Sequence, residues 1–195
     1  MLASGRGVSP TVKIRDGRDG SVIRESTVFD PSFKGGVNLA VGNFNGDKVT
    51  DITVGAGMGG GPLVHILNGL NFSDMGSFFA YEPSFRGGVN IATADVDGDG
   101  IDEIITGAGN GGSPLVKVFS ARGDDLDAFF AYESGLRTGV RVAGEDIDGD
   151  GREELITAPL MGIQRIQAFA VGNRDPKLNY FATTNEELPF SLRVG

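Results

Sequence analysis

Acidic and amide residues recur at three places in the chain with the same alternating spacing. Each segment follows the pattern D/N-x-D/N-x-D-x-x-x-D/E, and the three segments begin at Asn43, Asp95 and Asp146. Alternate side chains in such a segment converge on one point, and the seventh residue offers its backbone carbonyl. Calcium is a hard cation that takes about six to eight oxygen ligands at about 2.3–2.6 Å. The pattern therefore predicts three calcium loops.

The predicted ligands are the acidic and amide side chains of each loop together with the carbonyl at the seventh position. They are Asn43, Asn45, Asp47, Val49 and Asp51 in the first loop, Asp95, Asp97, Asp99, Ile101 and Glu103 in the second loop, and Asp146, Asp148, Asp150, Arg152 and Glu154 in the third loop. The first loop has only two carboxylates, and it carries Lys48 where the others have glycine. We therefore expect up to three calcium ions, with the first site weakest.

Two other interpretations of these loops are weaker. A solvated acidic turn would explain one copy, but four carboxylates crowded into a loop repel one another unless a cation neutralises them. An EF-hand needs flanking helices and a glutamate at the twelfth position. That position holds Val54, Thr106 and Thr157 in this chain, between predicted strands.

The loops belong to a longer repeat, because they start 52 and 51 residues apart and their flanks recur in step. An apolar alternating stretch precedes each loop, and a second one follows it. A third recurring stretch reads Pro62–Ile66 and Pro114–Val118, and a fourth reads Phe78–Glu82 and Phe129–Glu133. Four short strands per repeat, separated by Gly, Asn and Asp turns, are typical of a propeller blade. The sequence thus predicts an all-β propeller of about four four-stranded antiparallel blades.

The ends of the chain are predicted to complete one blade together. We expect a single domain over residues 1–195, with repeats at about 35–86, 87–137 and 138–187 and a split blade made of 188–195 and 1–34. Pairing the terminal strands would close the ring and remove exposed sheet edges. A homodimer that completes an eight-bladed ring, or a piece of a longer array, remains an open alternative to a closed monomer.

Composition excludes several classes of function. The net charge of −9 disfavours nucleic acid and anionic membrane surfaces, which require a basic footprint. The chain has no cysteine, so disulfides and thiolate metal sites are impossible. No apolar run approaches the length of a membrane span, and residues 1–7 lack the apolar core of a signal peptide. If the protein is secreted, its signal is not in this chain.

No catalytic or cofactor-binding residue is predicted, and the chain is expected not to be an enzyme. His65 is the only histidine and alternates with apolar neighbours, as a surface strand residue does. Lys34, Arg86 and Arg137 occupy equivalent positions. They could form a cationic ring for an anionic glycan, but solvated corners with packed stems are the more ordinary interpretation. Tyr81 and Tyr132 are expected to pack between blades.

The repeat resembles the FG-GAP repeat family, which includes the integrin α-subunit propeller and bacterial surface proteins of the FG-GAP/VCBS type. The resemblance rests on the loops, on Phe33–Gly36 and Phe85–Gly88 before them, and on Gly55–Gly57 and Gly107–Gly109 after them. Thr157–Pro159 replaces the last of these motifs in the third copy, and the fourth blade has no cation loop.

This resemblance implies a calcium-stabilised binding, adhesion or scaffold module at the cell surface or outside the cell. Its partner would be a protein or glycan. Two alternatives remain open. The first is a carbohydrate-active enzyme, such as a polysaccharide lyase or hydrolase, built on a propeller. The second is a purely structural or designed minimal propeller without a ligand.

Overall fold

The chain folds into four antiparallel sheets of short strands. The computed structural model describes residues 1–162 and 165–181. The first sheet contains β1 (Leu2–Ala3), β2 (Thr11–Arg15) and β3 (Val22–Thr27), and the second contains β4 (Val37–Gly42), β5 (Asp51–Ala56), β6 (Leu63–Leu67) and β7 (Asp74–Phe79). The third contains β8 (Val89–Ala94), β9 (Glu103–Ala108), β10 (Leu115–Phe119) and β11 (Asp125–Phe130), and the fourth contains β12 (Val140–Glu145), β13 (Glu154–Pro159), β14 (Arg165–Phe169) and β15 (Leu178–Phe181).

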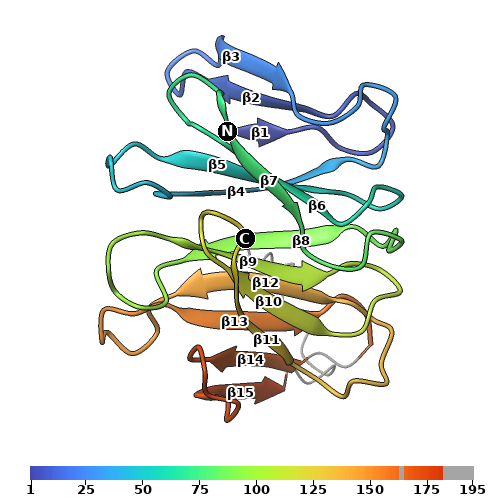
Figure 1. The fold of residues 1–195 in the computed structure, drawn as a ribbon, viewed down its shortest axis with the longest axis vertical. Helices are drawn as coiled ribbons and strands as arrows, with labels where there is room; N and C mark the ends of the chain where they lie inside the picture. The colour runs from blue at the N-terminus through green and yellow to red at the C-terminus, as the bar shows by residue number, and fades with distance from the viewer. Residues whose placement is uncertain (163–164, 182–195) are drawn as a thin grey trace.

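Strands within each sheet pair in chain order, so every sheet is a simple meander. The sheets follow one another along the long axis of the molecule, from the N-terminal sheet to the C-terminal one (Figure 1). The prediction of an all-β fold with about four propeller blades is confirmed. The predicted closing strand at 188–195 lies outside the described residues, and the first sheet has three strands within them. No helix that could cross a membrane occurs in the described part of the chain.

The three acidic loops all join the first and second strands of a sheet. Each loop is closed by a backbone pair, Gly42 with Asp51, Ala94 with Glu103 and Glu145 with Glu154. The last acidic residue of each loop is therefore the first residue of a buried strand. Because the sheets are meanders, the turn between the third and fourth strands lies at the same end of the sheet as the loop.

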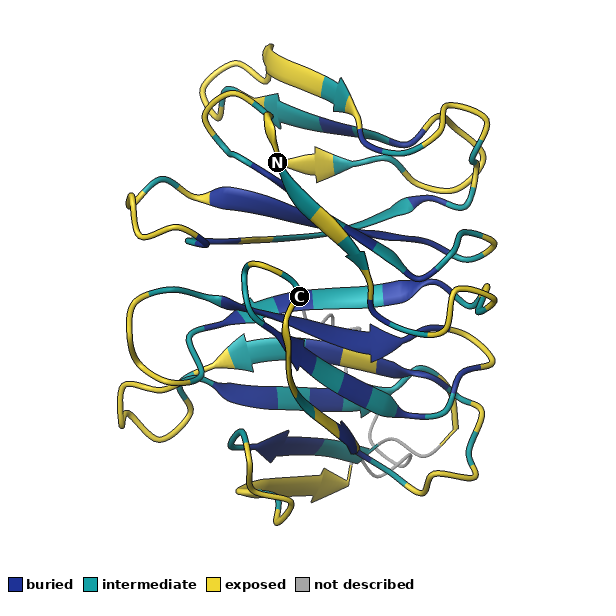
Figure 2. Cartoon of the chain, viewed as in Figure 1, coloured by how far each residue is buried: buried dark blue, intermediate teal, exposed yellow. Residues whose placement is uncertain are grey.

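Apolar side chains form three cores, one between each pair of neighbouring sheets. Ile52 and Val12 belong to the core between the first and second sheets, Ile104 and Val64 to the next, and Ile105 to the last. The middle strands are accordingly buried, whereas β3 and β15 are largely exposed (Figure 2). This layered packing is typical of repeat architectures, in which each unit mainly contacts its neighbours.

Polar side chains fasten neighbouring sheets to one another. The Asn38 side-chain amide donates to the Val89 carbonyl, and the Asn90 amide donates to the Val140 carbonyl. The Tyr81 hydroxyl, which lies between sheets as expected, is within hydrogen-bond distance of Thr106 Oγ1 and the Leu115 carbonyl. In the next repeat, the Tyr132 hydroxyl is within hydrogen-bond distance of the Thr157 and Arg165 carbonyls. These bonds repeat with the period of the sequence and fix the spacing of the loops.

Candidate metal centre

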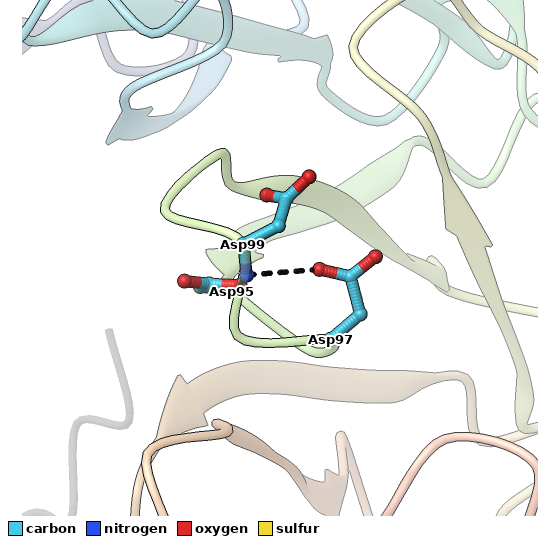
Figure 3. Close-up of side chains that lie close together, drawn as sticks. All are labelled: Asp95, Asp97 and Asp99. Atoms are coloured by element: carbon cyan, nitrogen blue, oxygen red, sulfur yellow. Dashed lines mark hydrogen bonds between the residues drawn. The ribbon is translucent and has the colours of Figure 1, made fainter.

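The second loop (residues 95–103) gathers three aspartates at one point. Carboxylate oxygens of Asp95, Asp97 and Asp99 all lie within 4.8 Å of one another. The backbone folds around them because Asp95 accepts hydrogen bonds from the amides of Gly98 and Gly100 (2.7 and 2.8 Å). Figure 3 shows the three side chains around this turn, with the Asp99 amide donating to Asp97. The loop therefore presents converging oxygens, as a site for a hard cation requires.

Glu103 adds a buried carboxylate to the second loop. Its exposed fraction is 7%, and Oε2 accepts a hydrogen bond from the Val96 amide at 3.2 Å. Burial, followed by the negative charges of Asp97, Asp99 and Asp95, raises the pKa of Glu103 to about 7. No basic side chain of the described residues forms an ion pair with these four carboxylates. An ionised Glu103 in this position lacks a positive partner, and the chemistry of the loop fits a divalent cation.

The third loop (residues 146–154) has the same shape but already contains a positive group. Oxygens of Asp146, Asp148 and Glu154 lie within 4.8 Å of one another. The Lys177 ammonium lies 2.6 Å from Asp148 Oδ2 and 2.8 Å from Glu154 Oε1. These contacts raise the pKa of Lys177 above its ordinary value. Asp150 lies at the edge of the cluster, with Oδ2 3.6 Å from the ammonium.

The first loop (residues 43–51) is arranged differently. The Asn43 side-chain amide donates to the Gly100 carbonyl of the second loop, and the Asn45 amide donates to Asp47. Asp51 turns toward the β6–β7 turn, where Oδ1 accepts from the Gly69 amide at 3.0 Å. Its other oxygen, Oδ2, is buried without a hydrogen-bond partner. Hydrogen bonds from amide groups thus engage one carboxylate oxygen of Asp47 and one of Asp51. The other Asp51 oxygen is buried and unpaired.

Lys48 shows the strain expected at its position. Its φ is +64°, whereas the equivalent Gly100 and Gly151 have φ of +84° and +87°. A left-handed conformation is costly for a residue with a Cβ and free for glycine. The first loop is therefore held in the same backbone shape as the others at a greater conformational cost.

The seventh-position residues Val49, Ile101 and Arg152 lie in the second half of each loop, two residues before the strand that follows. The amide of Val49 donates to Asp47, that of Ile101 to Asp99 and that of Arg152 to Asp150, at 2.7, 2.8 and 2.9 Å. These bonds fold the backbone back over the acidic side chains. The position of their carbonyls as ligands stays a prediction.

Two acidic residues that the ligand pattern passes over link successive loops. The Asp102 carboxylate accepts a hydrogen bond from the backbone amide of Asn43, and the backbone amide of Asp102 donates to the backbone carbonyl of Asn43. Glu153 makes the same pair of bonds with the backbone of Asp95. Both residues stand at the eighth position of their loops, where the first loop has Thr50. The signal in the sequence was an extra acid at this one position in the second and third copies.

The remaining candidate residues have ordinary structural partners. His65 Nε2 lies 3.0 Å from Asp74 Oδ1 on the neighbouring strand. The side chains of Lys34, Arg86 and Arg137 each donate to backbone carbonyls of their own corner, at Pro31, Pro83 and Ser134. These three side chains therefore stabilise their own local turns and are not directed together at an anionic ligand.

Comparisons with known proteins agree with this architecture. Residues 87–124, which contain the second loop, match the FG-GAP repeat. The chain is 35% identical to Integrin alpha-V of Gallus gallus over 102 residues, or 51% of this chain and 9% of that protein. It is 32% identical to Integrin alpha-PS2 of Drosophila melanogaster over 89 residues, or 45% of this chain and 6% of that protein.

A longer match covers more of the chain at lower identity. Integrin alpha-5 of Xenopus laevis is 26% identical over 171 residues, or 76% of this chain and 16% of that protein. The chain thus spans less than a fifth of the length of these curated relatives.

Proposed function

We propose that this chain, whose residues 87–124 match the FG-GAP repeat and which is similar to integrin α chains, is a calcium-stabilised module that binds a protein or glycan outside the cell. The ligands would be those predicted from the loop pattern, and calcium would supply the positive charge that the acidic loops need. Up to three ions would bind, with the first loop weakest.

The second loop carries this proposal. Three aspartate side chains converge there beside a buried glutamate whose pKa is raised to about 7. A buried carboxylate surrounded by like charges is unfavourable unless a cation neutralises it. Of the two acidic groups whose oxygens converge in the described residues, this one has no ion-pair partner, whereas the other contacts the Lys177 ammonium. Asp95, Asp97, Asp99 and Glu103 would hold the ion, while their bonds to the loop amides keep the oxygens in place.

The proposal places this module outside the cell, where calcium is abundant enough to fill sites of the affinity typical of extracellular modules. Extracellular calcium modules typically bind calcium at about 10⁻⁴–10⁻³ M, a range in which a site is filled outside cells and empty in the cytosol. The similar proteins are integrin α chains, which supports an adhesion-type role with a protein partner. A glycan is the second class of partner.

A glycan-cleaving enzyme has less support. It would need a cationic clamp on one ring face, and Lys34, Arg86 and Arg137 were the candidates for it. Each of them instead donates to carbonyls of its own corner. A purely structural propeller without a ligand remains to be separated from a binding module by experiment.

Calcium binding is tested by calorimetric titration of the chelated protein, with melting followed in parallel. We expect calcium to bind and to raise the melting temperature of the wild type. Asp97→Asn should weaken binding about tenfold or more, because it removes one of four charges that face the ion. Asp19→Asn is the matched control, since Asp19 lies in the β2–β3 turn of the first sheet. The absence of a heat of calcium binding, together with a melting temperature that exhaustive chelation does not change, would contradict the proposal.

The binding role is tested on a panel of extracellular matrix proteins and acidic glycans. Calcium-dependent capture without product release supports a binding module, whereas product release from a glycan supports an enzyme. A chain that captures nothing from either panel, with its calcium sites filled, would contradict the binding role.

A further inference from the structure

The third loop differs from the second because a side chain from the far edge of its own sheet enters it. Lys177 lies in the segment just before β15, the outermost strand of the fourth sheet. The β14–β15 turn and the third loop share one end of this meander, so a long side chain can reach from one to the other. Its ammonium contacts Asp148 Oδ2, Glu154 Oε1 and, at 3.6 Å, Asp150 Oδ2.

The corresponding turns of the other sheets supply no such cation. In the second sheet, Asn68 and the Gly69 amide donate to Asp51. In the third sheet, the β10–β11 turn contains Arg122, which is exposed and makes no ion pair among the described residues. Among the described residues, the fourth sheet is therefore the only one that places a basic side chain in ion-pair contact with an acidic loop.

The ammonium occupies oxygens that a metal ion would need. Asp148 and Glu154 are two of the three residues whose oxygens converge in this loop, and Lys177 lies within 2.8 Å of both. Glu154 is 1% exposed, so its charge depends on a partner inside the protein. A lysine ammonium is a compact point charge with three donors, which suits a cage of carboxylates. Calcium and Lys177 cannot both use the same oxygens.

We propose that Lys177 is the built-in cation of the third loop, which makes this loop stable without calcium and admits calcium only when Lys177 is displaced. The inference rests on the proposed function in so far as it concerns calcium, and the role of Lys177 as the counter-charge of Glu154 stands apart from it. The second loop would then be the principal calcium site of the molecule.

The first test is melting in a chelator. Lys177→Met should lower the melting temperature by about 5 °C or more, because it leaves the buried Glu154 charge without a partner. Lys13→Met is the matched control, since it removes the same charge from the partly exposed pair with Glu25 on β2 and β3, and it should cost less than about 2 °C. If Lys177→Met melts like Lys13→Met, the proposal is overturned.

The second test is calcium stoichiometry at constant ionic strength. At about 1 mM free calcium, Lys177→Met should bind one ion more than the wild type, or bind the same ion at least about tenfold more tightly. Lys13→Met should match the wild type. Equal stoichiometry and affinity in wild type and Lys177→Met would overturn the displacement. Absence of binding in every variant, together with the melting loss, would instead overturn the calcium function and leave Lys177 as the cation of the loop.

A third measurement needs no variant and covers the case in which Lys177→Met fails to fold. The wild-type protein is treated briefly with an amine-acetylating reagent, and each lysine is quantified by mass spectrometry. Lys177 should label several-fold more slowly than the exposed Lys48 in chelator, and its labelling should rise in saturating calcium while that of Lys13 stays constant. Labelling of Lys177 as fast as Lys48 in chelator contradicts the proposal.

Discussion

Glu103 is the residue at which the candidate metal centre can be tested most directly. It is buried, and burial together with three neighbouring aspartates raises its pKa to about 7. Its negative charge therefore destabilises the fold when no cation is bound and stabilises it when a cation is bound. A substitution that removes this charge without changing the size of the side chain should have opposite effects under the two conditions.

We predict that Glu103→Gln raises the melting temperature in chelator and reduces the gain that calcium confers. The amide can still accept the hydrogen bond from the Val96 amide, so the change is mainly one of charge. Differential scanning calorimetry at pH 8, with and without calcium, measures both effects. Glu82→Gln, an exposed glutamate outside the loops, is the control. A lower melting temperature for Glu103→Gln in chelator would contradict the prediction.

The acidic residues at the eighth loop position join loops of neighbouring sheets. Asp102 accepts from the Asn43 amide, as Glu153 does from the Asp95 amide. The link aligns the hairpin ends of successive sheets, and it explains why an acid stands at a position that the ligand pattern leaves free.

We predict that Asp102→Ala destabilises the protein by about 1–3 kcal/mol, because it leaves the amide of Asn43 without its charged acceptor. Urea unfolding followed by circular dichroism measures the loss. Thr50→Ala alters the same loop position in the first loop, where no hydrogen bond of the side chain is present in the described structure. It should change stability by less than about 0.5 kcal/mol, and equal losses for the two variants would argue against the link.

The last hairpin is attached to the third sheet by an ion pair. Arg174, in the turn before β15, donates to both oxygens of Asp127 on β11. The bond from Arg174 lowers the pKa of Asp127 below its ordinary value of 3.8. A carboxylate with a lowered pKa in the folded state contributes stability that is fully present above its unfolded pKa and is lost as the pH falls through the folded one.

We predict that Asp127→Asn costs up to about 1 kcal/mol at pH 7, since the pair is partly exposed. The difference from wild type should narrow as the pH falls below 3.8, the ordinary pKa of the carboxyl group. Denaturant titrations over pH 3–7 test this. Arg174→Ala should behave alike, and the double variant should lose no more than the larger single loss. Additive losses would show that the two residues act independently.

Many of the strands and loops were predictable from the sequence. The alternating apolar stretches predicted β4, β8 and β12 because their period of two is strong and undisturbed. The loops were predictable from the fixed spacing of acids such as Asp95 and Asp97. The contact of Lys177 was not, because it joins the β14–β15 turn to a loop 23 or more residues away. Asp102 was missed because its partner lies on another sheet, and sequence spacing within one repeat contains no record of such partners.

At the scale of the whole molecule, three separate cores hold four sheets in series. Ile105 lies in the core between the third and fourth sheets, and Ile52 lies in the core between the first and second. Stability in such an arrangement is approximately a sum of units and of interfaces between neighbours. A substitution in one core should therefore destabilise mainly the two sheets that form that core.

We predict that Ile105→Ala, at a cost of about 3 kcal/mol, accelerates amide hydrogen exchange in β8–β15 more than in β1–β3. Ile52→Ala should show the reverse preference. Mass-spectrometric exchange resolves the sheets because local opening reports the stability of each unit. Uniform acceleration by both variants would mean that the molecule opens as one cooperative body.

We propose that the chain forms one propeller domain rather than half of a paired ring. A single species of 20.4 kDa in light scattering, with and without calcium, supports this proposal, and a species of twice that mass refutes it.

The bonds between successive loops have a consequence for how ions would be taken up. The Asn43 amide is held by the residue just before Glu103, and the Asp95 amide by the residue just before Glu154. An ion that orders one loop would thereby also restrain the first residue of the neighbouring loop. A filled site would then lower the entropic cost of ion binding at the next loop. Uptake along this row is expected to be cooperative, with a Hill slope above one that Asp102→Ala lowers.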